Sequence, residues 1–270
     1  MRTLVAAAVV LLFTVPAWAG ETEWQTVAPD VHMRLIASDL LRSDGTTLAA
    51  LEIEMPSTTK TYWRVPGETG IATKLDIAGS ESIAGHRIVW PYPILDTKGG
   101  YTDFVYYGST VLPVELDVRG ESPVLQATLL MGVCSEICVP VNASFTLPLD
   151  FSSPDRSQGL RINQALALAP VDWDQSREPI GDVTFDAKSE TLGVPVSDAK
   201  VDPLSVIAEG DDLLFGAPQK SQDGRLVLIP LLGGNGTEGL VGRSIQLTFM
   251  TPMGPFELLR RVAPSTPGEL

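Results

Sequence analysis

The chain has 270 residues, enough for two domains of ordinary size or one large all-β domain. Hydrophobic residues make up 44% of the chain and charged residues 19%, a composition that excludes a disordered protein and a multi-span membrane protein. Lys and Arg number 19 against 33 Asp and Glu, and the formal net charge of −14 argues against nucleic acid or an anionic membrane surface as a partner.

The first residues have the pattern of a secretory signal peptide. Arg2 precedes an apolar run from Leu4 to Val15, and Ala17-Trp18-Ala19 provides the small residues of a cleavage site. A transmembrane anchor is the alternative, but the run is shorter than the roughly 18 to 20 apolar residues that cross a bilayer. We therefore expect residues 1–19 to be removed. The remainder is expected to be periplasmic and soluble, without stable membrane insertion, in a compartment where disulfides persist.

After residue 20 the dominant hydrophobic period is two. Apolar and charged residues alternate at 51–55 and 114–119, which places one face of each strand in a core and the other in water. Further β-rich runs occur at 31–36, 86–90, 124–131, 226–232, 245–249 and 256–259. Glycine-rich turns such as Gly99-Gly100 separate the runs. The pattern predicts antiparallel strands packed as β-sandwiches.

The two cysteines, Cys134 and Cys138, are separated by three residues. Along an extended strand their Cα atoms would lie about 13 Å apart, whereas a disulfide requires about 4.4–6.8 Å. The segment must therefore fold back if the cysteines pair. The flanking runs 129–131 and 139–141 both have strand character, so we predict a tight hairpin closed by the pair at one end of a sheet.

A structural disulfide and a redox-active disulfide are both compatible with this spacing. Closing so small a loop contributes roughly 2 kcal/mol, and a domain of this length has enough core without it. A small, exposed ring is also more easily exchanged, which favours redox chemistry. Glu136 lies between the sulfurs as a candidate modulator of the thiol pKa, and the nearest residues include no cation, so these thiols are predicted to be poor nucleophiles by themselves.

Copper binding is the main rival function. Two thiolates at this spacing suit Cu(I), with Met131 as a possible third soft ligand and the two histidines, His32 and His86, as ligands only if the fold brings them near. Two cysteines and two histidines are too few for a four-ligand zinc or iron–sulfur site without carboxylates or a second chain. A structural interaction module is the second rival. We expect no cofactor.

The segment 157–169 is predicted to be helical, with Leu160, Gln164 and Leu168 on one stripe and Pro170 ending it. It follows a polar turn, so we place the domain junction there. The expected organisation is a signal peptide at 1–19, a first β-sandwich at 20–151, a linker at 152–172, a second sandwich at 173–263 and a flexible tail at 264–270. One continuous β domain is the alternative.

Several motifs in the first half carry a family resemblance. They are Tyr62-Trp63-Arg64-Val65-Pro66-Gly67-Glu68-Thr69-Gly70, Gly79-Ser80, Trp90-Pro91-Tyr92-Pro93, Val111-Leu112-Pro113-Val114 and Gly132-Val133-Cys134-Ser135-Glu136-Ile137-Cys138-Val139-Pro140. Their order resembles the periplasmic N-terminal domain of the thiol:disulfide interchange reductase DsbD, and more closely its ScsB-type relatives from copper-tolerance operons. The likeness covers about residues 25–150, and residues 170–263 resemble the second immunoglobulin-like domain of ScsB-type proteins.

The resemblance implies an all-β protein with two immunoglobulin-like antiparallel sandwiches in tandem. It implies that the cysteine pair takes electrons from a membrane-embedded or thioredoxin-like donor and passes them to disulfide-containing periplasmic client proteins. By the same resemblance Cys138 forms the mixed disulfide and Cys134 resolves it. An aromatic cap loop shields the pair in that family, and the matching residues here are Tyr101, Phe104 and Tyr106, with Tyr107 close behind. Plain core packing is the alternative for these aromatic residues. The chain carries neither the membrane-spanning nor the thioredoxin domain of those reductases, so we expect its electrons to come from another polypeptide.

Overall fold

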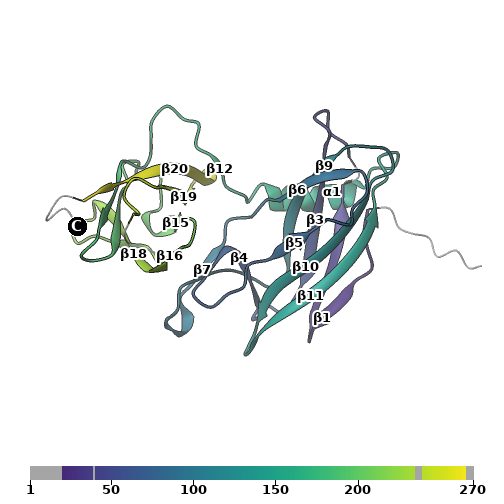
Figure 1. Cartoon of the computed structure of the whole chain (residues 1–270), viewed down its shortest axis with the longest axis horizontal. Coiled ribbons are helices and arrows are strands. Elements are labelled where there is room, and N and C mark those ends of the chain that lie inside the picture. The colour runs from purple at the N-terminus through teal and green to yellow at the C-terminus, as the bar shows by residue number, and fades with distance from the viewer. Residues whose placement is uncertain (1–19, 39, 235–238, 266–270) are drawn as a thin grey trace, which may run out of the picture.

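The structure is a computed structural model that describes residues 20–38, 40–234 and 239–265. Strands dominate these residues, and antiparallel pairing dominates the strands, which confirms the predicted all-β, immunoglobulin-like class. Figure 1 shows two β units side by side, a first unit of β1 to β11 with helix α1, and a second unit of β12 to β20. The predicted signal peptide and residues 266–270 of the predicted tail lie outside the described residues, and the domain boundaries stay predictions.

Two sheets form the first unit. One has the strand order β1-β2-β3-β9-β6 and the other β11-β10-β4-β8-β7, with β5 paired to β10. A 3-10 turn, η1 (Lys98–Gly100), joins β7 to β8. The strands are β1 (Gln25–Ala28), β2 (Val31–Ala37), β3 (Thr46–Glu54), β4 (Lys60–Gly67), β5 (Lys74–Asp76), β6 (Ile83–Ile88), β7 (Ile94–Asp96), β8 (Asp103–Tyr107), β9 (Thr110–Val118), β10 (Val124–Cys134) and β11 (Cys138–Pro148).

The two-residue alternation in the sequence produces this sandwich. In β9 the apolar residues Val114, Leu116 and Val118 are buried while the charged residues between them are partly exposed, as predicted. The inward faces of the two sheets share one hydrophobic core, which includes the fully buried ring of Trp63 packed edge-on against Phe104 at 6.0 Å between centroids. Burial of this shared face holds the sheets together.

Helix α1 (Arg156–Leu166) follows the first unit. It packs on the sheet that contains β2, β3 and β9. The Asp155 carboxylate begins it by accepting hydrogen bonds from two main-chain N–H groups of the first turn. The helix packs through Ile162, whereas Leu160 and Leu168 are 63% and 60% exposed. The Leu160–Gln164–Leu168 stripe is therefore not the buried face of the helix. Within the described residues, no helix is long and apolar enough to cross a membrane.

The second unit is one continuous nine-stranded sheet that bends around its own core. Its main path runs β15-β19-β20-β13-β14-β18-β16. Strands β12 and β13 both pair parallel to β20, so this unit departs from the purely antiparallel pairing that we predicted. Its elements are β12 (Val171–Asp172), β13 (Val183–Asp186), β14 (Thr191–Pro195), η2 (Pro203–Ser205), β15 (Ile207–Glu209), β16 (Leu213–Phe215), β17 (Gln219–Lys220), β18 (Leu226–Gly234), β19 (Ser244–Thr251) and β20 (Gly254–Pro264).

The two units meet at β4. The Arg64 guanidinium lies 2.8 Å from carboxylate oxygens of both Glu209 and Glu257 in the second unit. The Tyr92 hydroxyl donates a 2.5 Å hydrogen bond to the carbonyl of Ser205, and Ile207 joins the buried core of the first unit. Because this contact combines ion pairs with apolar burial, the second unit is seated on the sheet that also carries the cysteines.

Candidate functional site

The cysteines lie at the turn between β10 and β11. Cys134 ends β10, Cys138 begins β11, and the two residues face each other in the antiparallel register. Their sulfurs form a disulfide, and their Cα atoms are 4.0 Å apart. The predicted hairpin is thus confirmed. In Figure 1 this hairpin forms the lower tip of the first unit, so the disulfide lies at one end of the sandwich.

The two sulfurs have different surroundings. Cys134 is 2% exposed and packs against Tyr62 and Val105, whereas Cys138 is exposed. The asymmetry follows from the register, since the end of β10 is covered by β4 while β11 is the edge strand of its sheet. A partner can therefore approach Cys138 directly, and Cys134 lies behind it.

Tyr62 contacts both sulfurs. Its hydroxyl oxygen lies 2.7 Å from the sulfur of Cys134 and 3.6 Å from the sulfur of Cys138. The ring is held between Gly70 and Gly132, and a Cβ on Gly70 would overlap it. Burial raises the pKa of Tyr62 above its usual value, so the phenol keeps its proton at neutral pH. The site therefore holds a fixed hydroxyl donor for a negative charge on Cys134.

Lys60 lies opposite Cys134 in the register between β4 and β10. Its ammonium group is bound by two carboxylates, at 2.8 Å from Asp96 and 3.1 Å from Asp103. Burial alone would lower the pKa of Lys60, but the two carboxylates outweigh it and raise the pKa above its ordinary value. The expectation that the thiols have no cation nearby held only for neighbours in the sequence, because the fold brings Lys60 beside Cys134.

Asp96 and Tyr107 complete the polar side of the site. Burial alone would raise the pKa of Asp96, but hydrogen bonds from Lys60, from the Tyr107 hydroxyl at 2.7 Å and from the Lys98 main chain hold it below the ordinary value. Lys98 also lies over the Tyr107 ring at 5.1 Å. A cavity of about 500 Å³ opens here, lined by Ser57, Thr58, Lys60, Asp96, Lys98, Tyr107, Cys134 and Ser135.

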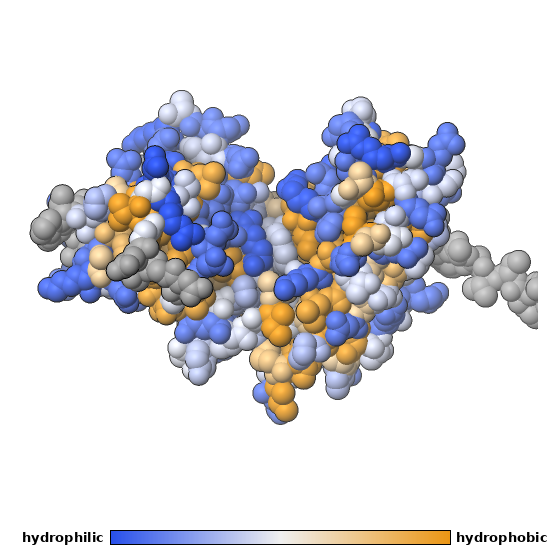
Figure 2. All heavy atoms as spheres, in the orientation of Figure 1, coloured by the Kyte–Doolittle hydropathy of each residue, from blue (hydrophilic) through white to orange (hydrophobic). Residues whose placement is uncertain are grey.

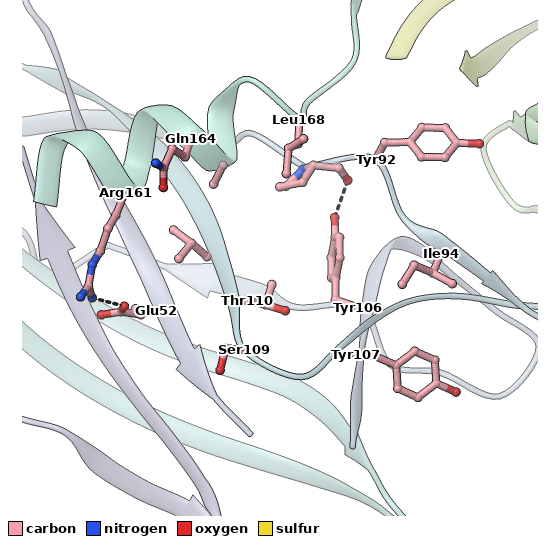
Figure 3. Close-up of a pocket in the computed structure, with 13 residues that line it drawn as sticks. Glu52, Tyr92, Ile94, Tyr106, Tyr107, Ser109, Thr110, Arg161, Gln164 and Leu168 are labelled. Carbon is pink, nitrogen blue, oxygen red and sulfur yellow. Dashed lines mark hydrogen bonds and ion pairs between the residues drawn. The ribbon is translucent and has the colours of Figure 1, made fainter. Parts of the chain in front are cut away.

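The structure corrects the predicted shielding residues. Phe104 is 1% exposed and packs in the core against Trp63, and the Tyr106 hydroxyl donates to the Pro91 carbonyl at 2.6 Å. Figure 3 shows the Tyr106 and Tyr107 rings leaving β8 in different directions. Since successive residues of a strand point to opposite faces, Tyr107 rather than Phe104 or Tyr106 lies on the face that carries Cys134.

The remaining predicted residues do not line the polar cavity beside Cys134. Tyr101 is 54% exposed beyond η1 and does not line the cavity beside Cys134, and Glu136 is exposed in the hairpin turn. Met131 is fully buried in the sandwich core, on the face of β10 opposite Cys134, so it cannot be a third copper ligand with the pair. His32 and His86 lie on β2 and β6 of the other sheet. The described residues contain no group of three or more His, Cys, Asp and Glu side chains arranged to hold a metal ion.

Tyr62 and Lys60 are the site residues that the sequence analysis did not assign. Tyr62 was in a quoted motif, and Lys60, Tyr62 and Arg64 alternate along β4, which indicates a shared face. The missing information was the pairing of β4 with β10, which joins segments more than 70 residues apart.

The comparisons with known proteins agree with this geometry. Residues 27–150 match the family model described as thiol:disulfide interchange protein DsbD, N-terminal. This region is similar to the N-terminal domain of DsbD. The match confirms the resemblance that the sequence motifs carried, and it contains both cysteines together with Tyr62 and Lys60. No curated protein sequence matches the chain.

Solved structures extend the likeness beyond the DsbD-type domain. The crystal structure of the N-terminal periplasmic domain of ScsB from Proteus mirabilis covers 92% of this chain and 100% of its own length. The TM-score is 0.72 and the sequence identity 21%, so the likeness concerns the fold. Because it spans nearly the whole described chain, it includes the second unit as well as the DsbD-type domain.

Proposed function

We propose that the chain relays electrons in the periplasm by thiol–disulfide exchange through Cys134 and Cys138. The donor is a membrane-embedded or thioredoxin-like protein, and the acceptors are disulfide-containing client proteins. The unequal exposure of the two sulfurs supports this proposal most directly, since an exchange centre needs one sulfur that a partner can reach and a second sulfur to resolve the intermediate. The likeness to a periplasmic domain supports the compartment, and the chemistry needs no cofactor.

Reduction of the pair starts at the exposed sulfur. A donor thiolate attacks Cys138, the bond between Cys138 and Cys134 breaks, and Cys134 leaves as a thiolate. The donor and Cys138 then share a mixed disulfide. A second thiolate of the donor attacks the donor's own sulfur in that bond and releases Cys138, so two electrons have entered the pair and the donor has become a disulfide.

Oxidation by a client uses the same atoms in reverse. The Cys138 thiolate attacks a client disulfide, forms a mixed disulfide and releases one client thiolate. Cys134 then attacks Cys138, which restores the intramolecular disulfide and releases the second client thiolate. On reduction the negative charge develops on Cys134, and on oxidation it passes from Cys134 to the released client thiolate. While Cys134 is a thiolate, the Tyr62 hydroxyl at 2.7 Å stabilises it by donating a hydrogen bond.

Trapping experiments test the assigned order. Cys134→Ser is expected to accumulate a mixed disulfide through Cys138 when mixed with a thioredoxin-like protein whose single active-site cysteine is joined to nitrothiobenzoate, because the Cys138 thiolate displaces nitrothiobenzoate from that sulfur. Cys138→Ser is expected to accumulate much less, because Cys134 is buried. Equal trapping by the two variants would contradict the order.

The reduction potential tests whether the disulfide is active at all. We expect a value less negative than about −300 mV, the upper limit for typical structural disulfides. A value well below that limit, together with no exchange with thioredoxin-like proteins, would identify a structural disulfide.

A further inference from the structure

The outer edge of the cysteine hairpin offers main-chain hydrogen-bonding groups. Gly132 faces Pro140 in the β10–β11 register. Its N–H donates to the Ile71 carbonyl at 3.2 Å, and its own carbonyl accepts from the Thr61 hydroxyl at 2.9 Å, so both of its groups point away from β11. Gly132 and Pro140 are therefore a non-hydrogen-bonded pair, and the carbonyl of Pro140, which has no N–H, points away from β10.

The alternation of an antiparallel ladder also sets the direction of the main-chain groups of Cys138. Residues two apart share their direction, so the N–H and carbonyl of Cys138 also point to the open edge of the sheet. Ser144 lies an even number of residues along β11 from Cys138, so its main-chain groups point in the same direction. Its carbonyl accepts a hydrogen bond from the Gln25 side chain on β1, on the side of β11 away from β10. Strand β1 lies beside β11 at that point, whereas Cys138, Val139 and Pro140 are exposed.

An apolar cavity of about 320 Å³ lies beside the same edge. It opens on the face of the hairpin that carries Val133 and Val139, opposite the face of Cys134 and Tyr62. Glu136 is the one ionisable residue among those that line it: Ala28, Pro29, Val31, Thr59, Val133, Ser135, Glu136, Ile137 and Val139. Ile137 is 74% exposed at its rim, and Figure 2 shows hydrophobic residues gathered at this lower tip of the molecule.

We propose, as an extension of the proposed function, that a partner binds this edge with an extended segment centred on its own cysteine. The segment pairs with the main chain of Cys138 and inserts an apolar side chain adjacent to its cysteine into the cavity. An antiparallel hydrogen-bonded pair sets Cα atoms about 5.5 Å apart, within the 4.4–6.8 Å that a mixed disulfide requires.

The directions of the partner's side chains are consistent with this pairing. When the partner cysteine points to the face of Cys138, its two neighbours in the segment point to the opposite face, where the cavity opens. The preferred substrates are therefore cysteines in exposed, extended segments with apolar neighbours. Acidic neighbours are disfavoured because Glu136 lies at the cavity.

Short peptides with one cysteine joined to nitrothiobenzoate test this substrate class. The Cys138 thiolate of the reduced full-length protein attacks the peptide sulfur and releases the coloured nitrothiobenzoate. Cys134 then attacks Cys138 and releases the peptide thiol, so the pair loses the two electrons that the peptide disulfide gains. Leucine on both sides of the peptide cysteine is expected to give a rate about tenfold higher than serine. N-methylation of the cysteine amide is expected to slow the reaction about fivefold.

Matched variants connect the preference to the cavity. Ala28→Phe fills the cavity and is expected to abolish the preference for leucine, while Ala78→Phe, at an exposed turn outside the cavity, is expected to retain it. Equal rates for leucine and serine peptides, with normal oxidation of the pair by bis(2-hydroxyethyl) disulfide, would overturn this inference and leave the exchange function intact. Failure of every disulfide to oxidise the pair would instead refute the proposed function.

Discussion

Replacing Tyr62 by phenylalanine removes one hydroxyl from the site and leaves its ring in place. That hydroxyl lies 2.7 Å from the sulfur of Cys134, the atom that receives negative charge when a partner attacks Cys138. A hydrogen bond to a charged group contributes about 1.5–3 kcal/mol. With about half of the charge developed in the transition state, the loss is about 0.7–1.5 kcal/mol, so exchange is expected to slow about 3- to 12-fold.

The assay is stopped-flow reduction of the oxidised protein by a thioredoxin-like dithiol. Tyr107→Phe is the matched control, because it also removes one phenolic hydroxyl from the face that carries Cys134 but breaks the bond to Asp96 rather than a contact with sulfur. Because the hydroxyl stabilises the Cys134 thiolate of the reduced pair, its loss is also expected to make the reduction potential more negative. A wild-type rate in Tyr62→Phe would refute the reasoning.

Three further predictions follow from the contacts around β4. Lys60→Met leaves two nearly buried carboxylates without their cation, so the free energy of unfolding at neutral pH is expected to fall by about 3–5 kcal/mol. The pKa of Asp96 is lowered in the folded protein, so the stability it contributes is present above its unfolded pKa and is lost as the pH falls through its folded pKa. Denaturant titrations should therefore show a smaller difference between wild type and variant in acid, and an equal difference at all pH values would contradict the assignment. Gly70→Ala pushes a Cβ into the Tyr62 ring and is expected to slow exchange at least as much as Tyr62→Phe; an unchanged rate would show that the ring position is unimportant. Arg64→Ala removes both ion pairs between the units and is expected to widen the molecule in small-angle scattering, whereas an identical scattering curve would show that apolar contacts alone hold the units together.

Local pattern was sufficient to predict the strands and the cysteine hairpin. The alternation in β9 has a period of two residues, and the structure buries the apolar members as expected. The hairpin followed from chain geometry, because two cysteines four residues apart cannot pair across an extended strand. Both inferences use residues that are close in the sequence, where covalent geometry limits the possible arrangements.

The errors arose where a face or a distant partner had to be chosen. Tyr106 and Tyr107 are neighbours on β8 and point to opposite faces, Tyr106 to the core and Tyr107 to the face of Cys134. An error of one residue in the alternation therefore selects the wrong tyrosine. In α1 the predicted stripe shares a helical face, but Ile162 decides which side is buried by packing on the sheet, a contact that the helix sequence does not contain. Lys60 reaches the site through strand pairing across more than 70 residues.

Strand β4 connects the second unit to the sulfur pair. Tyr62 contacts the sulfurs and Arg64, two residues further, holds the carboxylates of Glu209 and Glu257. Between them the fully buried Trp63 lies beneath the Arg64 guanidinium at 4.5 Å. The regular pairing of β4 with β8 is interrupted between Tyr62 and Gly67, so the ladder alone does not fix this segment. The ion pairs of Arg64 with the second unit therefore restrain a segment of β4 that lies beyond the regular ladder, two residues from Tyr62.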